Sequence, residues 1–294
     1  MDTVDRLLEG AVDLHCHSGP SPMPRRITHV EAAAQASEVG MRAIVAKCHY
    51  HSTVFDILAM RPLLAGLRTQ VFGGIALNSQ VGGINPHAVD LSLRMGGREI
   101  WFPTISASAH LCHAAQDPQI QAHFQPRGLM QSEEVDIFGP DGDLLPEVHQ
   151  VIDLAKRAGA LVSAGHLAPD RILALVTALH AAGHDRVVVS HPNFVIKAER
   201  EQVARYADLG ATIEHEITMY DEDRIFPLRT LVDWIELIGP DRTTLASDLG
   251  QVGKPLPVEA YRRVLPRLLD AGVSEKDVRK MISINPARLI GLGD

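Results

Sequence analysis

The chain has 294 residues, of which 46% are hydrophobic and 22% are charged, and this composition is typical of a folded globular protein. Its formal net charge is -8 and no run of Lys or Arg is longer than a pair, which argues against a nucleic-acid partner. No stretch approaches 18 uninterrupted apolar residues, and the first ten residues lack the regions of a signal peptide. We therefore expect a cytoplasmic protein that does not bind membranes, with Cys16, Cys48 and Cys112 as reduced thiols.

Short apolar segments alternate with longer amphipathic segments along the whole chain. The apolar segments predict eight strands, at 11–15, 43–47, 71–77, 99–103, 161–164, 186–190, 212–216 and 243–247. The amphipathic segments predict eight helices, at 28–39, 55–67, 86–95, 145–158, 169–182, 197–209, 226–238 and 258–271. A last helix is expected over 284–292, with Asn285 as N-cap and Pro286 at the first helical position.

Eight strands that alternate with eight helices predict a (β/α)8 TIM barrel, a single domain over residues 1–294. A doubly wound sheet is the alternative, but no Gly-x-Gly-x-x-Gly follows the first predicted strand. The connection after the fourth strand, at about residues 104–144, is too long for a plain loop, and its segment 137–144 resembles a hairpin with a Gly-Pro-Asp-Gly turn. We expect this insertion to lie over the mouth of the barrel, with His110, His113 and His123 as loop residues.

Histidines and carboxylates follow the predicted strands at the end where a parallel barrel carries its reactive groups. His15 and His17 lie two residues apart, so on a strand both side chains face the same way and Cys16 faces the other way. Single residues of the same kind end later strands: His166, His191 and Asp248. A lone His-x-His pair is weak evidence, but the combination predicts a site for divalent cations.

This arrangement resembles the metal-dependent hydrolases of the amidohydrolase superfamily, and the closing segment 285–292 is similar to the C-terminal helix of that superfamily. Within it, the Lys47-Cys-His and Gly82-Gly-Ile-Asn-Pro stretches look like a small cytosolic branch. The resemblance implies that His15, His17 and Asp248 bind one divalent ion, and that His166 and His191 bind a second ion or the substrate. It also implies that Asp248 acts as general base.

Neutral imidazoles and carboxylates suit zinc, with manganese, iron or nickel as alternatives, and one or two ions are expected. Many members of the superfamily end their fourth strand with a Lys or Glu that bridges two metals, whereas this strand ends in Phe-Pro-Thr104. Lys47 is the candidate replacement, as a carbamylated metal ligand. A salt bridge to Asp248 and a contact with a substrate carboxylate are its alternative roles, and without ligation by Lys47 a single-metal site is expected.

Four further residues are predicted to contact the substrate: His49, Arg25, Asn78 and Glu216. An Arg on this rim could hold a carboxylate or phosphate through two parallel hydrogen bonds. Glu214 and Glu216 share one face of their strand and His215 has the other, so either set could reach the site.

The predicted function is hydrolysis of an amide, ester or lactone bond of a small polar molecule by a metal-activated water. A phosphoesterase, a decarboxylase, and a barrel that binds a metal or ligand without turnover are the alternatives. The apolar content is compatible with a homo-oligomer, although no sequence feature indicates its interface.

Overall fold

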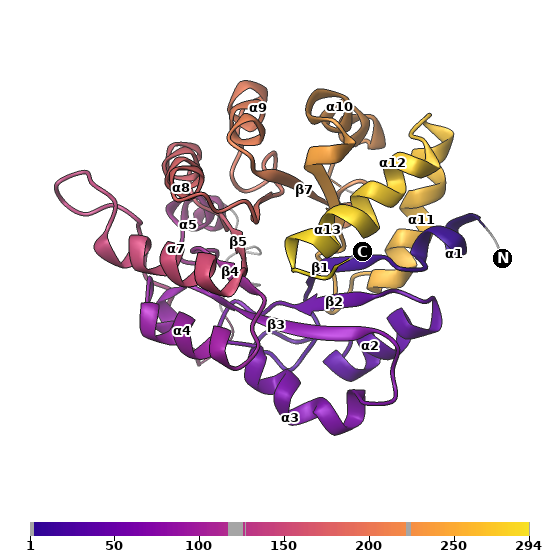
Figure 1. Cartoon of the computed structure of the whole chain (residues 1–294), viewed down its shortest axis with the longest axis horizontal. Coiled ribbons are helices and arrows are strands. Elements are labelled where there is room, and N and C mark those ends of the chain that lie inside the picture. The colour runs from indigo at the N-terminus through magenta and orange to yellow at the C-terminus, as the bar shows by residue number, and fades with distance from the viewer. Residues whose placement is uncertain (1–2, 117–125, 127, 222–224, 294) are drawn as a thin grey trace.

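The computed structural model describes residues 3–116, 126, 128–221 and 225–293 as one (β/α)8 barrel (Figure 1). Its eight strands are parallel and pair in chain order: β1 (Val12–Cys16), β2 (Ala43–Ala46), β3 (Gln70–Ala76), β4 (Glu99–Trp101), β5 (Leu161–Ser163), β6 (Val187–Ser190), β7 (Thr212–Glu216) and β8 (Thr243–Ala246). Each coincides with a predicted strand, and the single-domain barrel is confirmed. The predicted fourth strand is two residues too long, because Phe102 and Pro103 leave the ladder.

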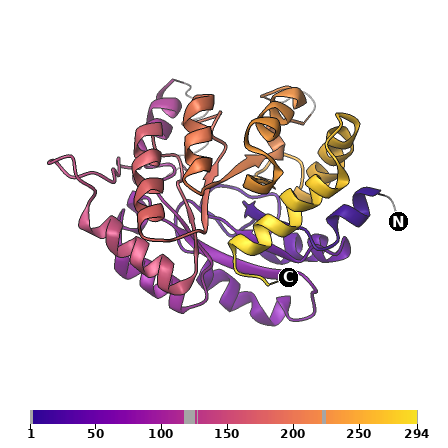
Figure 2. The same ribbon diagram turned by 45° about the horizontal axis from the view of Figure 1, so that its top comes forward.

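Eight helices alternate with the strands and surround them (Figure 2): α2 (His29–Glu38), α3 (Val54–Leu64), α4 (Pro86–Arg94), α7 (Pro146–Ala158), α8 (Pro169–Ala181), α9 (Arg200–Asp208), α10 (Leu228–Ile238) and α11 (Pro257–Asp270). Local chemistry sets several of their starts. Thr28 and Glu31 form a capping box on α2, and the Asn85 side chain caps α4 by accepting a hydrogen bond from the Ala88 amide. Among the described residues, short helices absent from the prediction include α1 (Thr3–Leu8) and α5 (Ser108–Ala115).

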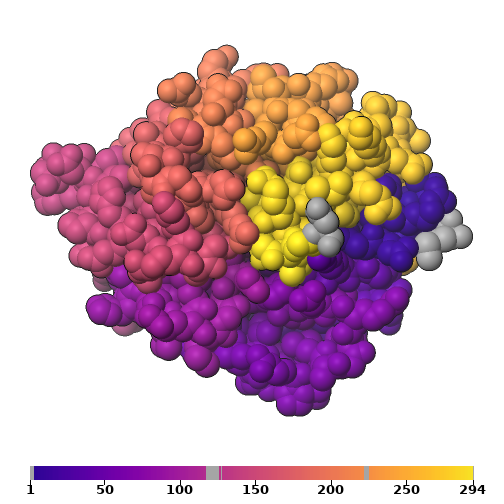
Figure 3. Space-filling model, in the orientation of Figure 1, coloured from indigo at the N-terminus to yellow at the C-terminus, as the bar shows by residue number. Residues whose placement is uncertain are grey.

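The barrel interior is closed at the end where the strands begin. Val12, Leu14 and Val45 pack inside the barrel in one buried cluster with Leu289 and Ile290 of the C-terminal segment. Figure 3 shows the C-terminal segment, in yellow, near the centre of the face that this view presents. Because the floor is sealed by apolar packing, a polar site is left to the opposite end, where the strands finish.

The predicted start of the last helix at Asn285 is wrong. Helix α12 (Glu275–Arg279) begins after Ser274, whose side chain caps it, and the chain continues through one wider turn (Lys280–Ile284) into α13 (Asn285–Leu289). Asn285 therefore has helical backbone angles, and its Nδ2 donates to the carbonyl oxygens of Pro240 and Thr243 at 2.8 and 2.7 Å. These hydrogen bonds attach the C-terminal segment to the start of β8.

The insertion after β4 contains the expected hairpin. Phe138 and Leu144 form an antiparallel bridge, and the Gly142 amide donates to the Gly139 carbonyl within the turn. His123 lies outside the described residues. No helix in the described part of the chain is both long and apolar enough to span a membrane.

Candidate metal centre

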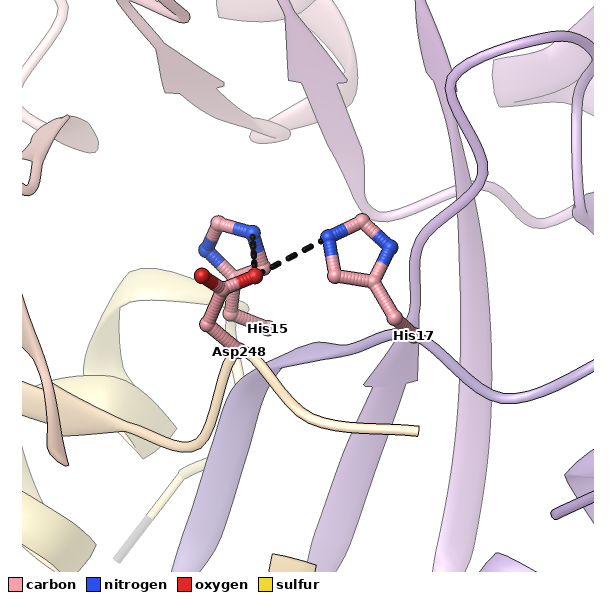
Figure 4. Close-up of side chains that lie close together, drawn as sticks. All are labelled: His15, His17 and Asp248. Atoms are coloured by element: carbon pink, nitrogen blue, oxygen red, sulfur yellow. Dashed lines mark ion pairs between the residues drawn. The ribbon is translucent and has the colours of Figure 1, made fainter. Parts of the chain in front are cut away.

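A histidine of β1, a histidine directly after it and a carboxylate after β8 converge at the end of the barrel where the strands finish. Asp248 Oδ1 lies 3.1 Å from His17 Nε2 and 3.4 Å from His15 Nε2. Figure 4 shows the carboxylate pointing between the two imidazoles. One ligand atom from each residue lies within 4.8 Å of the other two, so a single cation can contact all three. We call His15, His17 and Asp248 the rim triad.

The seam between β1 and β8 places the rim triad. The Asp248 amide donates to the His15 carbonyl at 2.8 Å, and the His17 amide donates to the Leu249 carbonyl at 2.7 Å. Asp248 has a φ of +54°, a conformation that is rare for residues other than glycine and that occurs often at functional sites. Gly250 completes the close approach, because a Cβ there would come within 2.1 Å of the His17 carbonyl oxygen.

A carboxylate behind His15 orients its ring. His15 Nδ1 lies 3.0 Å from Glu214 Oε1, and Glu214 also accepts a hydrogen bond from the Ser190 hydroxyl at 2.8 Å. When the Nδ1–H group donates a hydrogen bond to Glu214, Nε2 carries no proton. Its lone pair then faces Asp248 and is available to a cation.

A small cavity of about 60 Å³ opens beside the rim triad. Further histidines line it: His49, His110, His166 and His191. The rings of His166 and His191 have centroids 4.8 Å apart, and His166 Nδ1 lies 2.9 Å from His110 Nδ1. Among the described residues, a second group of three could also hold a cation: His15, Glu214 and Glu216. The predicted ligands His166 and His191 share the cavity but belong neither to this group nor to the rim triad. The treatment of His110 as a loop residue is wrong, because α5 carries it into the cavity wall.

Burial keeps the histidines of this cavity neutral. It lowers the pKa of His15 and His191 to about 3 and that of His110 to about 4, because the charged imidazolium loses its hydration. The pKa values of His17, His49 and His166 lie well below the usual value for the same reason. Neutral imidazoles are the form that binds metals, so these side chains can act as ligands without first losing a proton.

Lys47 lies beneath the rim triad. Its Nζ is 2.9 Å from His15 Nε2, it is 1% exposed, and it is absent from the cavity lining. Four buried carboxylates interact with one another in the barrel interior, and we call them the acidic cluster: Asp13, Glu99, Glu214 and Glu216. Lys47 interacts electrostatically with the three glutamates. Burial raises the pKa of Asp13 to about 6 and the pKa values of Glu99, Glu214 and Glu216 above their usual range, and Lys47 opposes the shift of the three glutamates.

Glu216 and the other glutamates of the acidic cluster do not line the cavity. Glu216 is fully buried, and its Oε1 lies 3.5 Å from His15 Nδ1, on the side of the ring away from Asp248. Glu216 therefore lies behind His15, and its contact with substrate stays a prediction. Sequence reasoning gave Glu99 no role, although its spacing of two from the inward-facing Trp101 was a usable signal.

Asn78 is also behind the cavity wall rather than in it. Its Nδ2 donates to the His49 carbonyl at 2.8 Å and to Thr104 Oγ1 at 2.7 Å, while its Oδ1 accepts from the amides of Thr104 and Ser106. Thr104 Oγ1 lies 2.9 Å from His49 Nδ1. The predicted substrate contact of Asn78 is thus indirect, because Asn78 positions His49, which does line the cavity.

Arg25 and Arg26, although adjacent in the chain, have different surroundings. Arg25 lines the cavity, whereas Arg26 donates to the Lys254 carbonyl at 2.7 Å and lies 3.6 Å from Glu259 on the surface. Arg25 is the one arginine of the lining, which includes no lysine.

The donor set of the rim triad fits a divalent cation. Two neutral imidazole nitrogens and one carboxylate oxygen face a common point, and this combination suits zinc and the neighbouring transition metals. The cavity beside them leaves room for a further ligand, which is the arrangement of catalytic rather than structural zinc sites.

Solved structures with a similar fold include several hydrolases and a 2,6-dihydroxybenzoate decarboxylase. An amidohydrolase from Pseudomonas aeruginosa is 12% identical with a TM-score of 0.67, and the match covers 99% of this chain and 98% of that one. The probable dipeptidase PvdM from Pseudomonas aeruginosa is 13% identical with a TM-score of 0.63, over 98% and 96% of the two chains. The phosphotriesterase homology protein from Escherichia coli, complexed with phosphate in its active site, is 15% identical with a TM-score of 0.56, over 99% and 100%.

These likenesses confirm the predicted resemblance at the level of the fold, which is that of amidohydrolases and phosphotriesterase-like metallohydrolases. No curated protein matches the chain in sequence. A family model described as a family of unknown function matches residues 10–214, which include β1 to the middle of β7 but not Asp248. The chain therefore belongs to this family of unknown function, DUF6282.

Proposed function

We propose that this protein is a metal-dependent hydrolase that cleaves an amide, ester or lactone bond of a small polar molecule in the cytoplasm. The observation that carries the proposal is the convergence of His15 Nε2, His17 Nε2 and Asp248 Oδ1 beside a buried cavity at the end of the barrel where the strands finish. The fold shared with metal-dependent hydrolases supports the reaction class.

In this proposal each residue of the cavity has a separate role in hydrolysis. A divalent cation held by the rim triad, zinc as the first choice, supplies Lewis acidity to a carbonyl group and to water. Asp248 is partly exposed to the cavity, so its carboxylate can take a proton from the attacking water and pass it to the leaving group. Glu214 holds the His15 ring, and the neutral rings of His49, His166 and His191 orient the substrate as hydrogen-bonding groups.

We further propose a single ion and an unmodified Lys47. The Lys47 ammonium interacts electrostatically with the three buried glutamates of the acidic cluster. Carbamylation would replace that positive charge by a negative one among those carboxylates, which a low-dielectric interior disfavours. Lys47 then balances charge beneath the site, and the rim triad alone holds the metal.

The experiment measures metal per chain in protein purified without added metal, together with hydrolysis of small esters, lactones and N-acyl amino acids. We expect one zinc per chain, loss of the metal in His17→Ala, and retention in His87→Ala, a histidine of α4 outside the cavity. Absence of metal from the wild type after zinc is supplied would overturn the proposal. Bound zinc without turnover of any substrate class would instead support the binding-barrel alternative.

A further inference from the structure

Arg25 lines the cavity and has a hydrogen-bonding edge that no described residue uses. Its Nη1 contacts Met23 Sδ at 3.4 Å, whereas Nε and Nη2 are buried and have no hydrogen-bond partner among the described residues. Nε and Nη2 lie on the same edge of the planar guanidinium, and their N–H bonds point in parallel. This is the edge that binds two oxygens of one carboxylate or phosphate group.

The surroundings hold this edge in place. Arg25 pairs with Gln251 in an antiparallel bridge, and its Cβ and Cγ lie so close to Gly19 that a Cβ there would come within 3.2 Å of both. The side chain lines the same cavity as His17, His49 and Asp248. A guanidinium that is removed from water and keeps two donors unsatisfied is costly, so a ligand that satisfies both would be bound tightly.

We propose that Arg25 binds an oxyanion group of the substrate, so that the molecule cleaved at the rim triad is an anion, with a carboxylate as the preferred group. The cleavage part of this statement rests on the proposed function, whereas the binding of the anion by Arg25 does not. A carboxylate is preferred because Asp248 shares the cavity and repels a monoanion less than it repels a phosphate dianion.

The test measures anion binding directly. Sodium acetate and sodium phosphate are titrated separately into the wild type, Arg25→Gln and Arg26→Gln, with sodium chloride at matched ionic strength as reference, and binding is followed by calorimetry and by the rise of Tm. The titrations are carried out with zinc-loaded protein and with zinc-free protein. Arg26→Gln is the matched control, because Arg26 is the neighbouring arginine with surface partners.

We expect acetate to bind the wild type and Arg26→Gln alike, and to bind Arg25→Gln about 10- to 100-fold more weakly, the effect of losing a charge-assisted bidentate contact. Arg25→Lys keeps the positive charge but lacks the two parallel N–H donors, so its affinity for acetate should lie between those of the wild type and Arg25→Gln. If the wild type binds phosphate more weakly than acetate, the preferred anionic group of the substrate is a carboxylate. The reverse order would overturn this preference and indicate a phosphate ester as substrate.

Equal anion affinity in the wild type and Arg25→Gln would overturn the inference. So would a difference that appears only when Arg25→Gln has lost its zinc, because the anion would then be bound by the metal. A wild type that binds acetate through Arg25 but holds no metal would refute the proposed hydrolysis and leave the anion site standing, so the two failures are distinguishable.

Discussion

Lys47 Nζ lies 2.9 Å from His15 Nε2, the same ring nitrogen that faces Asp248 Oδ1 at 3.4 Å. One lone pair therefore has two competing partners, the ammonium of Lys47 and a metal ion in the rim triad. When a metal takes this lone pair, the ammonium must turn toward the acidic cluster, whose carboxylates lie near enough to interact with it. The metal site and the buried charges beneath it are thus coupled through His15.

Replacement of Lys47 by Met should destabilise the zinc-free protein. Removing the buried ammonium leaves the nearby buried carboxylates without a compensating charge, and we expect the free energy of unfolding at pH 7 to fall by about 3–5 kcal/mol. The loss should shrink toward pH 5, because carboxylates with raised pKa values bind protons in the folded state before they do so in the unfolded state. Urea unfolding at both pH values measures this, with exposed Lys254→Met as control, and an equal loss at pH 5 and pH 7 would contradict it.

Asp248→Asn should separate metal binding from proton transfer. The amide keeps the shape of the side chain but cannot accept a proton from water, so kcat should fall at least about 100-fold even when zinc is added until the site is saturated. Zinc affinity should also fall, because one anionic ligand is lost. Steady-state kinetics and zinc titration test this, with exposed Asp233→Asn on α10 as control. Recovery of full kcat at high zinc would show that Asp248 is a ligand only.

Asn78→Ala should weaken both the fold and the placement of His49. Asn78 makes four hydrogen bonds that join the ends of β2, β3 and β4, and their loss should lower the free energy of unfolding by about 2–4 kcal/mol. Zinc content should stay unchanged while kcat/KM decreases, because His49 lines the cavity without belonging to the rim triad. Asn85→Ala removes a helix cap and a hydrogen bond to the Val81 carbonyl, both outside the cavity, and should cost about 1–2 kcal/mol while leaving kcat/KM unchanged.

His215 should contribute to loss of stability in acid. Burial alone lowers its pKa to about 3, whereas an unfolded chain protonates this residue near its ordinary pKa of 6.5. Below pH 6.5 the unfolded state therefore binds a proton at His215 that the folded state does not bind. The free energy of unfolding decreases as the pH falls, by up to about 1.4 kcal/mol per pH unit. His215→Asn should flatten this slope in urea unfolding between pH 7 and 5. The exposed His149→Asn should keep it, and an unchanged slope in His215→Asn would refute the assignment.

The sequence by itself determined the barrel and the rim triad. Alternation of apolar and amphipathic segments is a local property, and in a parallel barrel all strands finish at one end, so residues at the strand ends are brought together whatever the details of packing. The spacing of two between His15 and His17 predicts that both side chains face the same way, and both reach the site although the register of β1 shifts between Asp13 and Cys16. Asp248 joins them because β8 closes on β1.

Only the tertiary structure decided which neighbours surround these residues. The acidic cluster around Lys47 depends on the register between β1, β4 and β7, and strand order alone does not specify how deep each side chain lies. The path of α5 brings His110 into the cavity, and the bridge to Gln251 turns Arg25 inward while Arg26 stays on the surface. Such contacts join segments far apart in the chain, so no local pattern of residues encodes them.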